Sequence, residues 1–159
     1  PDLLIADEPT TALDVTIQAQ ILGLLKDIRG QRDMGIIMIT HDLGIVSDSC
    51  DRVAVMYCGE MVETSPVRQL FRDPLHPYTA GLIQALPRLT GTAKRLEAIE
   101  GMVPDAGQMP EGCRFHPRCK HAQPRCRKEH PELRALHDGR WVRCVLFQDK
   151  ERKVTQHEQ

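Results

Sequence analysis

The sequence has neither a strong net charge nor a long apolar segment, and these absences limit what the protein can be. Its 159 residues carry 21 Lys and Arg against 22 Asp and Glu, a formal net charge of −1. This balance gives no general attraction to nucleic acid or to an anionic membrane. No apolar segment approaches the roughly 20 residues that span a bilayer, and no signal peptide is visible. We therefore expect no membrane-spanning segment.

A phosphate-binding loop is also missing. The pattern Gly-x-x-x-x-Gly-Lys-Ser/Thr, whose backbone amides and lysine cradle nucleotide phosphates, occurs nowhere in the chain. As it stands, the chain is therefore expected not to hydrolyse ATP.

The most informative feature that is present lies at the start of the chain. The apolar run Leu3–Ala6 ends in two adjacent carboxylates, Asp7 and Glu8, and Pro9 then prevents the strand from continuing. Such a run is typical of a buried parallel strand that carries acids to the carboxyl edge of an open α/β sheet, where ligands bind. There one carboxylate can hold Mg²⁺ while its neighbour polarises a water molecule, as phosphoryl transfer from a nucleotide requires.

This strand resembles the Walker B strand of ABC-type ATPases, and its continuation Thr-Ala-Leu-Asp, residues 11–14, resembles the D-loop of that family. The resemblance implies that Asp7 holds Mg²⁺, directly or through water, that Glu8 is the general base, and that Asp14 bridges to a second subunit. The Ser-Gly-Gly-Gln signature of the family is absent, as is the phosphate loop. Both precede Walker B in the family, so we expect the chain to be the C-terminal part of a longer protein.

An amphipathic helix is predicted directly after Asp14. Apolar side chains recur there at helical spacing: Ile17, Ile21, Leu24, Leu25 and Ile28. Asp14 is placed to cap the start of this helix and Gly30 to end it. A second apolar run, Gly35–Thr40, predicts another parallel strand, so that residues 3–40 form a βαβ unit.

His41 follows this second strand and should reach the same sheet edge as Asp7 and Glu8. A histidine can donate a hydrogen bond to a phosphate oxygen at neutral pH without carrying a permanent charge. Its position, 34 residues after Asp7 across one βαβ unit, resembles that of the switch histidine of ABC ATPases. The resemblance implies that His41 contacts the γ-phosphate and the attacking water.

The remaining sequence predicts short elements followed by a change of composition. In order, we expect a helix at 43–49, a β-hairpin at 52–64 with its turn at 58–59, a helix from Pro66, and a helix from about Leu75 that Pro87 ends.

A shift towards Gly, Pro, Thr and Met after residue 88 marks a boundary. We therefore assign residues 1–87 to the C-terminal part of an ABC ATPase domain with a parallel sheet, residues 88–147 to a small cysteine-rich, metal-binding extension, and residues 148–159 to a disordered tail.

Four of the six cysteines gather in this extension: Cys113, Cys119, Cys126 and Cys144, with gaps of five, six and seventeen residues. A nucleotide-hydrolysing protein is normally cytosolic, where thiols stay reduced, so the cluster favours metal over disulfides. Thiolates can hold zinc or an iron–sulfur cluster. No Cys-x-x-Cys pair typical of zinc is present, and the wide, unequal gaps suit a 4Fe–4S cluster better. The spacing alone leaves both metals open, and also the absence of any metal.

Basic residues are in excess around these cysteines. Between residues 113 and 144, nine Lys or Arg stand against three acids. A cluster held by four thiolates is negatively charged, and nearby cations would stabilise it. We therefore interpret the excess as charge compensation rather than as a nucleic-acid surface.

Three segments resemble the C-terminal extension of oligopeptide and dipeptide ABC importer ATPases. They are His-Pro-Tyr-Thr at 76–79, Gly-Met-Val-Pro at 101–104, and Gly-Cys-Arg-Phe-His-Pro-Arg-Cys at 112–119. In some members of that family, four cysteines at such positions hold a 4Fe–4S cluster. The resemblance therefore favours this cluster at the four cysteines, with Zn²⁺ as the alternative.

The resemblance also implies a function. The protein would be the ATP- and Mg²⁺-dependent subunit of an ABC importer that powers uptake of oligopeptides or dipeptides. Its partners would be a second ATPase subunit and transmembrane permease subunits, which would hold it at the cytoplasmic face of the membrane; no nucleic acid is expected. The transported substrate is not encoded here, because the permease and a binding protein select it.

Two other functions remain open from the sequence. A soluble ABC ATPase not engaged in transport would share Asp7, Glu8 and His41, but we would expect it to lack the His-Pro-Tyr-Thr helix and the cysteines. A stand-alone metal-binding module would keep the cysteines and carry the ATPase half only as a relic.

Overall fold

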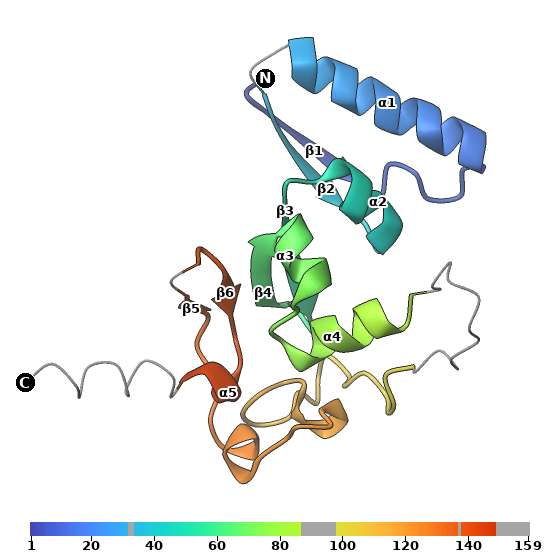
Figure 1. Ribbon diagram of the computed structural model, residues 1–159. Helices are drawn as coiled ribbons and strands as arrows, with labels where there is room; N and C mark the ends of the chain where they lie inside the picture. Colours follow the sequence, from blue (N-terminus) through green and yellow to red (C-terminus); the bar gives the residue numbers. More distant parts are fainter. Residues whose placement is uncertain (32–33, 87–97, 137, 149–159) are drawn as a thin grey trace, which may run out of the picture. The chain divides into compact units, whose positions relative to one another are not determined.

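The computed structural model describes residues 1–31, 34–86, 98–136 and 138–148 (Figure 1). The chain divides into two compact units, Pro1–Cys50 and Asp51–Gln159. Among the helices of the described ranges, none combines the length and the apolar character needed to cross a bilayer.

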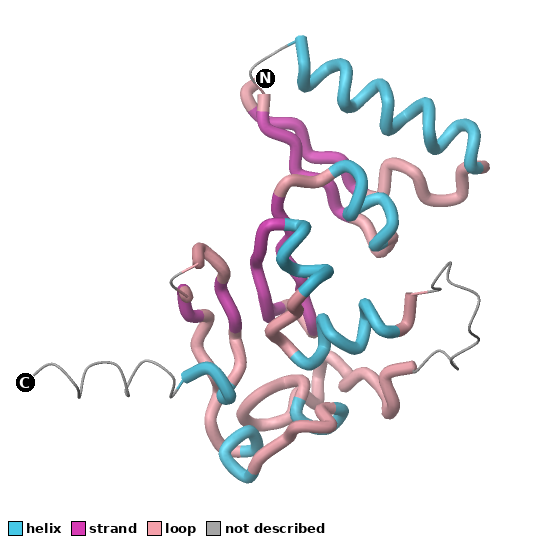
Figure 2. Tube along the Cα trace, viewed as in Figure 1, coloured by secondary structure: helices cyan, strands magenta, loops and turns pink. Residues whose placement is uncertain are grey.

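The first unit is the predicted βαβ arrangement, and it confirms the α/β character of the fold. Strand β1 (Leu3–Asp7) pairs in parallel with β2 (Gly35–Ile39), with Asp7 opposite Ile39 at the carboxyl end. Helix α1 (Val15–Gln31) connects the strands and runs beside them in Figure 2. Helix α2 (Leu43–Ser49) follows β2.

Side-chain caps set where both helices of this unit begin. Asp14 Oδ1 accepts hydrogen bonds from the backbone N–H groups of Thr16 and Ile17, both at 3.0 Å, which confirms the predicted cap. Asp42 caps α2 in the same way, through Gly44 N at 2.8 Å. Each cap contributes about 1 kcal/mol. The predicted stop at Gly30 is one residue too early, because a helix tolerates glycine at about 1 kcal/mol.

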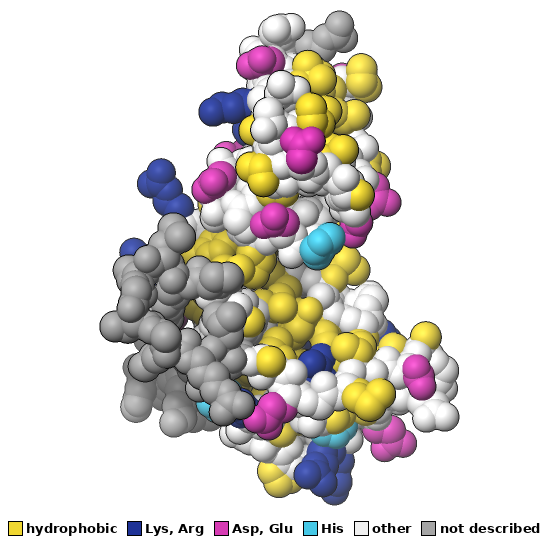
Figure 3. Space-filling model, turned by 90° about the vertical axis from the view of Figure 1, so that its right-hand side faces the viewer, with side chains coloured by type: hydrophobic (Ala, Val, Ile, Leu, Met, Phe, Trp, Pro, Cys, Tyr) yellow, Lys and Arg dark blue, Asp and Glu magenta, His cyan; other side chains and the backbone are white. Residues whose placement is uncertain are grey.

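Apolar side chains of the first unit remain open to solvent. Helix α1 has no buried residue, and Ile5 of β1 is 61% exposed. Hydrophobic side chains are visible at the surface in the upper part of Figure 3. Two strands, one long helix and one short helix cannot bury the apolar residues on both faces of a sheet, so this unit has little core of its own.

The second unit contains a four-stranded antiparallel sheet in the order β3-β4-β6-β5. Its strands are β3 (Arg52–Tyr57), β4 (Glu60–Pro66), β5 (Arg134–Ala135) and β6 (Trp141–Val142). The predicted hairpin is β3–β4, and its turn residues Cys58 and Gly59 have positive φ angles of 47° and 80°. The two short strands were not predicted, because two residues are too few to show alternation.

The helical elements of the second unit are short: α3 (Val67–Arg72), α4 (Pro77–Gln84), the 3₁₀ turns η1 (His116–Arg118) and η2 (Pro124–Arg127), and α5 (Val145–Gln148). The helices expected after Pro66 and Leu75 are therefore confirmed.

Aromatic side chains join the cysteine-rich segment to the hairpin. Phe115 is buried with Tyr57 of β3, and their rings meet edge to face with centroids 5.1 Å apart. Tyr78 of α4 lies against the same two rings, with its centroid 4.7 Å from that of Tyr57. Phe115 is therefore part of the core of the second unit, and Cys113 and Cys119 pack against that core. The boundary expected after Pro87 falls at residues 87–97, outside the described residues, as do residues 149–159 of the expected tail.

A buried carboxylate fixes the start of α4. Glu63 of β4 is fully buried and accepts hydrogen bonds from Leu75 N at 2.9 Å and from His76 N at 2.8 Å. His76 is buried as well, and its Nδ1 accepts a hydrogen bond from Tyr78 N at 3.0 Å, which caps the helix. Burial lowers the pKa of His76 from 6.5 to about 4, so this histidine is neutral in the fold.

Candidate functional site

The parallel pairing of β1 and β2 brings three predicted site residues to one sheet edge. Asp7 ends β1, Glu8 follows it, and His41 lies just beyond β2. His41 Nδ1 lies 3.2 Å from Glu8 Oε1, although 33 positions separate the two residues in the sequence. The expectation that Glu8 and His41 meet at this edge is confirmed.

Glu8 sits in a backbone conformation that is unusual for a residue with a side chain. Its φ angle is 45°, in the left-handed region, which costs an L-residue roughly 1–2 kcal/mol. Two backbone hydrogen bonds hold it there, from Glu8 N to Ile39 O at 2.8 Å and from Thr11 N to Glu8 O at 3.1 Å. Strained residues of this kind cluster at functional sites, and here the strain falls on the predicted base.

Two hydrogen-bond donors hold the carboxylate of Glu8. Thr11 Oγ1 donates to Oε2 at 2.9 Å, and His41 Nδ1 faces Oε1. The Thr11 hydroxyl, followed by the His41 ring, lowers the pKa of Glu8 below its usual value of 4.5. Glu8 is therefore an ionised carboxylate at neutral pH, the form that accepts a proton.

The contact with Glu8 determines where His41 carries its proton. An ionised carboxylate only accepts hydrogen bonds, so the Nδ1 of His41 must be the donor. A neutral ring with its proton on Nδ1 has no hydrogen on Nε2 and cannot donate from that atom to a phosphate. The expected phosphate contact therefore requires either a second proton on the ring or release of Nδ1 from Glu8.

The two aspartates at this edge have different settings. Asp7 is exposed at the end of β1, where an incoming cation can reach its carboxylate. Asp14 has a structural task, since its Oδ1 caps α1. Its expected contact with a second subunit stays a prediction.

The four predicted metal ligands, Cys113, Cys119, Cys126 and Cys144, belong to one neighbourhood in the second unit. None of them forms a disulfide. Cys113 N donates to Cys126 O at 2.9 Å, which ties together two of the cysteine-bearing segments. Burial, and then the nearby thiols of the other three, raise the pKa of Cys144 to about 12. Burial is also the first cause of the raised pKa values of Cys113 and Cys119.

The arrangement of these cysteines nevertheless does not form a metal site. Across the described ranges, no group of three or more His, Cys, Asp or Glu side chains is placed so that it could hold a metal ion. The donor chemistry fits a thiolate-bound metal, but the geometry does not support the metal-binding extension that the sequence predicted. Thiols with raised pKa values are protonated at neutral pH and would have to lose their protons on binding.

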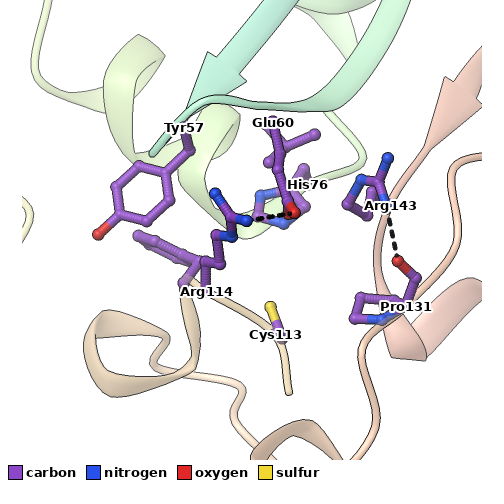
Figure 4. Close-up of a pocket in the computed structure, with 9 residues that line it drawn as sticks. Tyr57, Glu60, His76, Cys113, Arg114, Pro131 and Arg143 are labelled. Atoms are coloured by element: carbon purple, nitrogen blue, oxygen red, sulfur yellow. Dashed lines mark hydrogen bonds and ion pairs between the residues drawn. The ribbon is translucent and has the colours of Figure 1, made fainter. Parts of the chain in front are cut away.

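A small cavity lies beside Cys113, whose sulfur points towards it in Figure 4. Its volume of about 10 Å³ is enough for roughly one water molecule. The two arginines that line it already have partners within the protein. Arg114 forms an ion pair with Glu60 at 3.1 Å, and Arg143 Nη1 donates a hydrogen bond to Pro131 O at 3.0 Å. This cavity is therefore no substrate site.

Sequence reasoning missed the part that Thr11 plays. The side chain of Thr11 reaches Glu8 because the backbone turns sharply between them. Pro9 at the end of the strand indicates a turn, but the sequence does not predict the left-handed φ angle of Glu8 on which the contact depends.

Comparison with known proteins finds similarity to ATP-binding proteins of transport systems. Residues 62–126 match the family model described as "Oligopeptide/dipeptide transporter, C-terminal region". The oligopeptide transport ATP-binding protein AppD of Bacillus subtilis (strain 168) is 53% identical over 150 residues, which are 94% of this chain and 46% of AppD. Over most of its own length, this chain is similar to ATP-binding proteins of peptide transport. A putative peptide import ATP-binding protein of Brucella melitensis biotype 1 is 52% identical over 144 residues, covering 91% of this chain and 43% of that protein.

This chain spans about half the length of the curated proteins it matches. Among solved structures, cbiO1 from Clostridium perfringens, part of the ABC transporter complex cbiONQ, is 36% identical and covers 46% of this chain and 29% of its own. The TM-score of 0.43 is too low to establish a shared fold.

Proposed function

We propose that this chain provides the hydrolytic edge of the ATP-binding subunit of an ABC importer for oligopeptides or dipeptides. The observation that carries the proposal is the contact of 3.2 Å between His41 Nδ1 and Glu8 Oε1 at the carboxyl edge of a parallel sheet. Curated relatives described as oligopeptide transport or peptide import ATP-binding proteins favour transport over a soluble ATPase.

Each residue at the edge has a chemical task in this proposal. Glu8, ionised and held by two donors, takes a proton from the attacking water. His41 lies against the oxygen Oε1 of Glu8 and contacts the γ-phosphate once its Nε2 carries a proton. Asp7 would hold Mg²⁺, and the ion would supply positive charge beside the phosphates. The sequence of this chain contains no phosphate loop to bind them.

The partners follow from the same proposal. A second ATPase subunit, reached through Asp14, completes the nucleotide site, and permease subunits hold the protein peripherally at the cytoplasmic face of the membrane. No nucleic acid takes part, because the chain carries a net charge of only −1.

The proposal extends to the cysteines, which would bind a metal together, as a 4Fe–4S cluster or as Zn²⁺. Four thiols in one electrostatic neighbourhood support it, and the segments around them would have to close for all four to coordinate. Iron, sulfide and zinc content after anaerobic purification tests it, with Cys113→Ser and Cys119→Ser against Cys58→Ser in the hairpin turn as the control. About four irons and four sulfides indicate the cluster, one zinc indicates a structural site, and neither metal contradicts the proposal.

A chimera tests the hydrolytic role. The segment of AppD that matches this chain is replaced by residues 1–147, and ATP hydrolysis and peptide uptake are measured with the AppD transport system. We expect the chimera to support both, and its Glu8→Gln variant to bind ATP with at least a 100-fold lower turnover, because the base is lost. A chimera that binds ATP and hydrolyses it equally well with Gln at position 8 would contradict the assignment of Glu8.

A further inference from the structure

We propose that Thr11 is a positioning residue for hydrolysis, whose hydroxyl fixes the orientation of the Glu8 carboxylate. The inference rests on the proposed function, because it assigns to Thr11 a task in the reaction that Glu8 serves. The observation behind it is the hydrogen bond of 2.9 Å from Thr11 Oγ1 to Glu8 Oε2.

The backbone builds this contact. Glu8 adopts its left-handed conformation at the end of β1, and Thr11 N donates to Glu8 O at 3.1 Å, which closes a turn over residues 8–11. Ala12, with a φ angle of 60°, continues the irregular path. The turn brings the side chain of Thr11 back over that of Glu8, so that two residues three positions apart meet through both backbone and side chain.

The two oxygens of Glu8 are held from different parts of the unit. Oε2 is bound by Thr11 of the same turn, while Oε1 faces His41, which follows the other strand. One contact alone would allow the carboxylate plane to rotate about the Cγ–Cδ bond. Two contacts, one at each oxygen, fix that plane, and a fixed plane fixes the direction of the lone pairs that remain for a water molecule.

The local nature of the Thr11 contact sets it apart from that of His41. Thr11 lies in the same turn as Glu8, so its hydrogen bond does not depend on the relative position of the two strands. His41 has another expected partner in the γ-phosphate, and when it leaves Glu8 the hydrogen bond from Thr11 remains at Oε2. Thr11 thus holds one oxygen of the base in place while His41 changes partner.

The hydroxyl group can be removed with little change in shape. Thr11→Val keeps the size and branching of the side chain and removes the donor, whereas Thr11→Ser keeps the donor and removes the methyl group. Thr16→Val makes the same chemical change at the start of α1, away from the carboxylate of Glu8, and serves as the matched control.

The first measurement uses the chain as it is. The ¹³C resonance of the Glu8 carboxyl group, recorded at one neutral pH, should move in Thr11→Val and stay near its original position in Thr11→Ser and Thr16→Val.

The second measurement uses the chimera with AppD. There Thr11→Val should lower kcat by roughly ten-fold and change the KM for ATP less than about two-fold, because alignment of the base affects the chemical step and not binding. Thr11→Ser should restore kcat.

Three results would overturn the inference: an unmoved Glu8 resonance in Thr11→Val, an unchanged kcat in that variant, or a Thr11→Ser variant as slow as Thr11→Val. If the unmodified chimera hydrolyses no ATP, the proposed function fails, while the carboxyl resonance still decides whether Thr11 holds Glu8. The two failures are therefore distinguishable.

Discussion

His76 is a residue of the second unit whose surroundings change its chemistry. It is almost fully buried, its Nδ1 accepts a hydrogen bond from Tyr78 N, and its pKa falls to about 4. The unfolded chain would have the ordinary histidine value near 6.5. Between these two pH values His76 binds a proton in the unfolded state but not in the folded state, so folding becomes less favourable as the pH falls.

We therefore predict a pH-dependent stability that His76 controls. The contribution is fully present above about pH 6.5, declines towards pH 4, and changes no further below that. Its full size is about 3 kcal/mol in the free energy of unfolding. Denaturant unfolding followed by the fluorescence of Trp141, the single tryptophan of the chain, measures it in the second unit.

His76→Asn is the matched variant for this prediction. Asparagine can accept the hydrogen bond that caps α4 but does not titrate. The decline in stability between pH 6.5 and pH 4 should become shallower in this variant. An unchanged slope would show that another group is responsible.

At the scale of single elements, glycines decide where the cysteine-rich segment can turn. Gly112 has a φ angle of 71°, and a Cβ placed there would overlap the carbonyl oxygen of Cys126 and lie 2.8 Å from the carbonyl carbon of Arg127. The backbone of η2 thus approaches Gly112 too closely for any side chain. The same approach allows the hydrogen bond between Cys113 N and Cys126 O.

Gly112→Ala should therefore destabilise the second unit much more than a strained φ angle alone would. Gly139 has a similar φ angle of 76° but no atom near its would-be Cβ, so Gly139→Ala isolates the strain. We expect Gly112→Ala to lower the free energy of unfolding by about 2 kcal/mol more than Gly139→Ala, because backbone atoms must move. Equal midpoints in urea, followed through Trp141, would contradict this steric account.

The elements also show which parts of the structure a sequence can reveal. Helix α1 and its Asp14 cap were predictable because periodicity and capping are local. The meeting of Glu8 with His41 was predictable because parallel strands end at one edge. The contact of Thr11 with Glu8 was not, since it depends on a left-handed φ angle that glutamate rarely adopts. Strands β5 and β6 were missed because they gain their order from pairing, β6 with β4 and β5 with β6, and not from their own sequence.

At the scale of the whole molecule, the two units differ in how well they bury their apolar residues. In the first unit Ile5 and Ile37 pair across the strands yet are about half exposed or more, at 61% and 49%. In the second unit Leu70 and Val142 are almost completely buried. Burial of apolar area is the main favourable contribution to folding, so the two units should not be equally stable.

Hydrogen exchange should reveal this difference. We predict that the amides of the β1–β2 ladder exchange at least ten-fold faster than those of the β3–β4 hairpin, because local opening of the first unit exposes little additional apolar surface. Exchange followed by mass spectrometry or NMR in the full chain measures both ladders in one sample. Equal protection would show that the first unit has a stabilising contribution beyond its own burial.

The left-handed backbone at Glu8 lowers the stability of the first unit at the residue that is the proposed base. Alanine and glycine at this position both remove the carboxylate and its contacts with Thr11 and His41, but only glycine also removes the backbone strain. Glycine normally destabilises a folded chain relative to alanine. Here the order should reverse, and Glu8→Gly should be about 1 kcal/mol more stable than Glu8→Ala. Hydrogen exchange of the β1–β2 amides measures the difference. A laboratory selection for thermal tolerance alone would therefore favour glycine over alanine at this position, and either replacement would discard the proposed base.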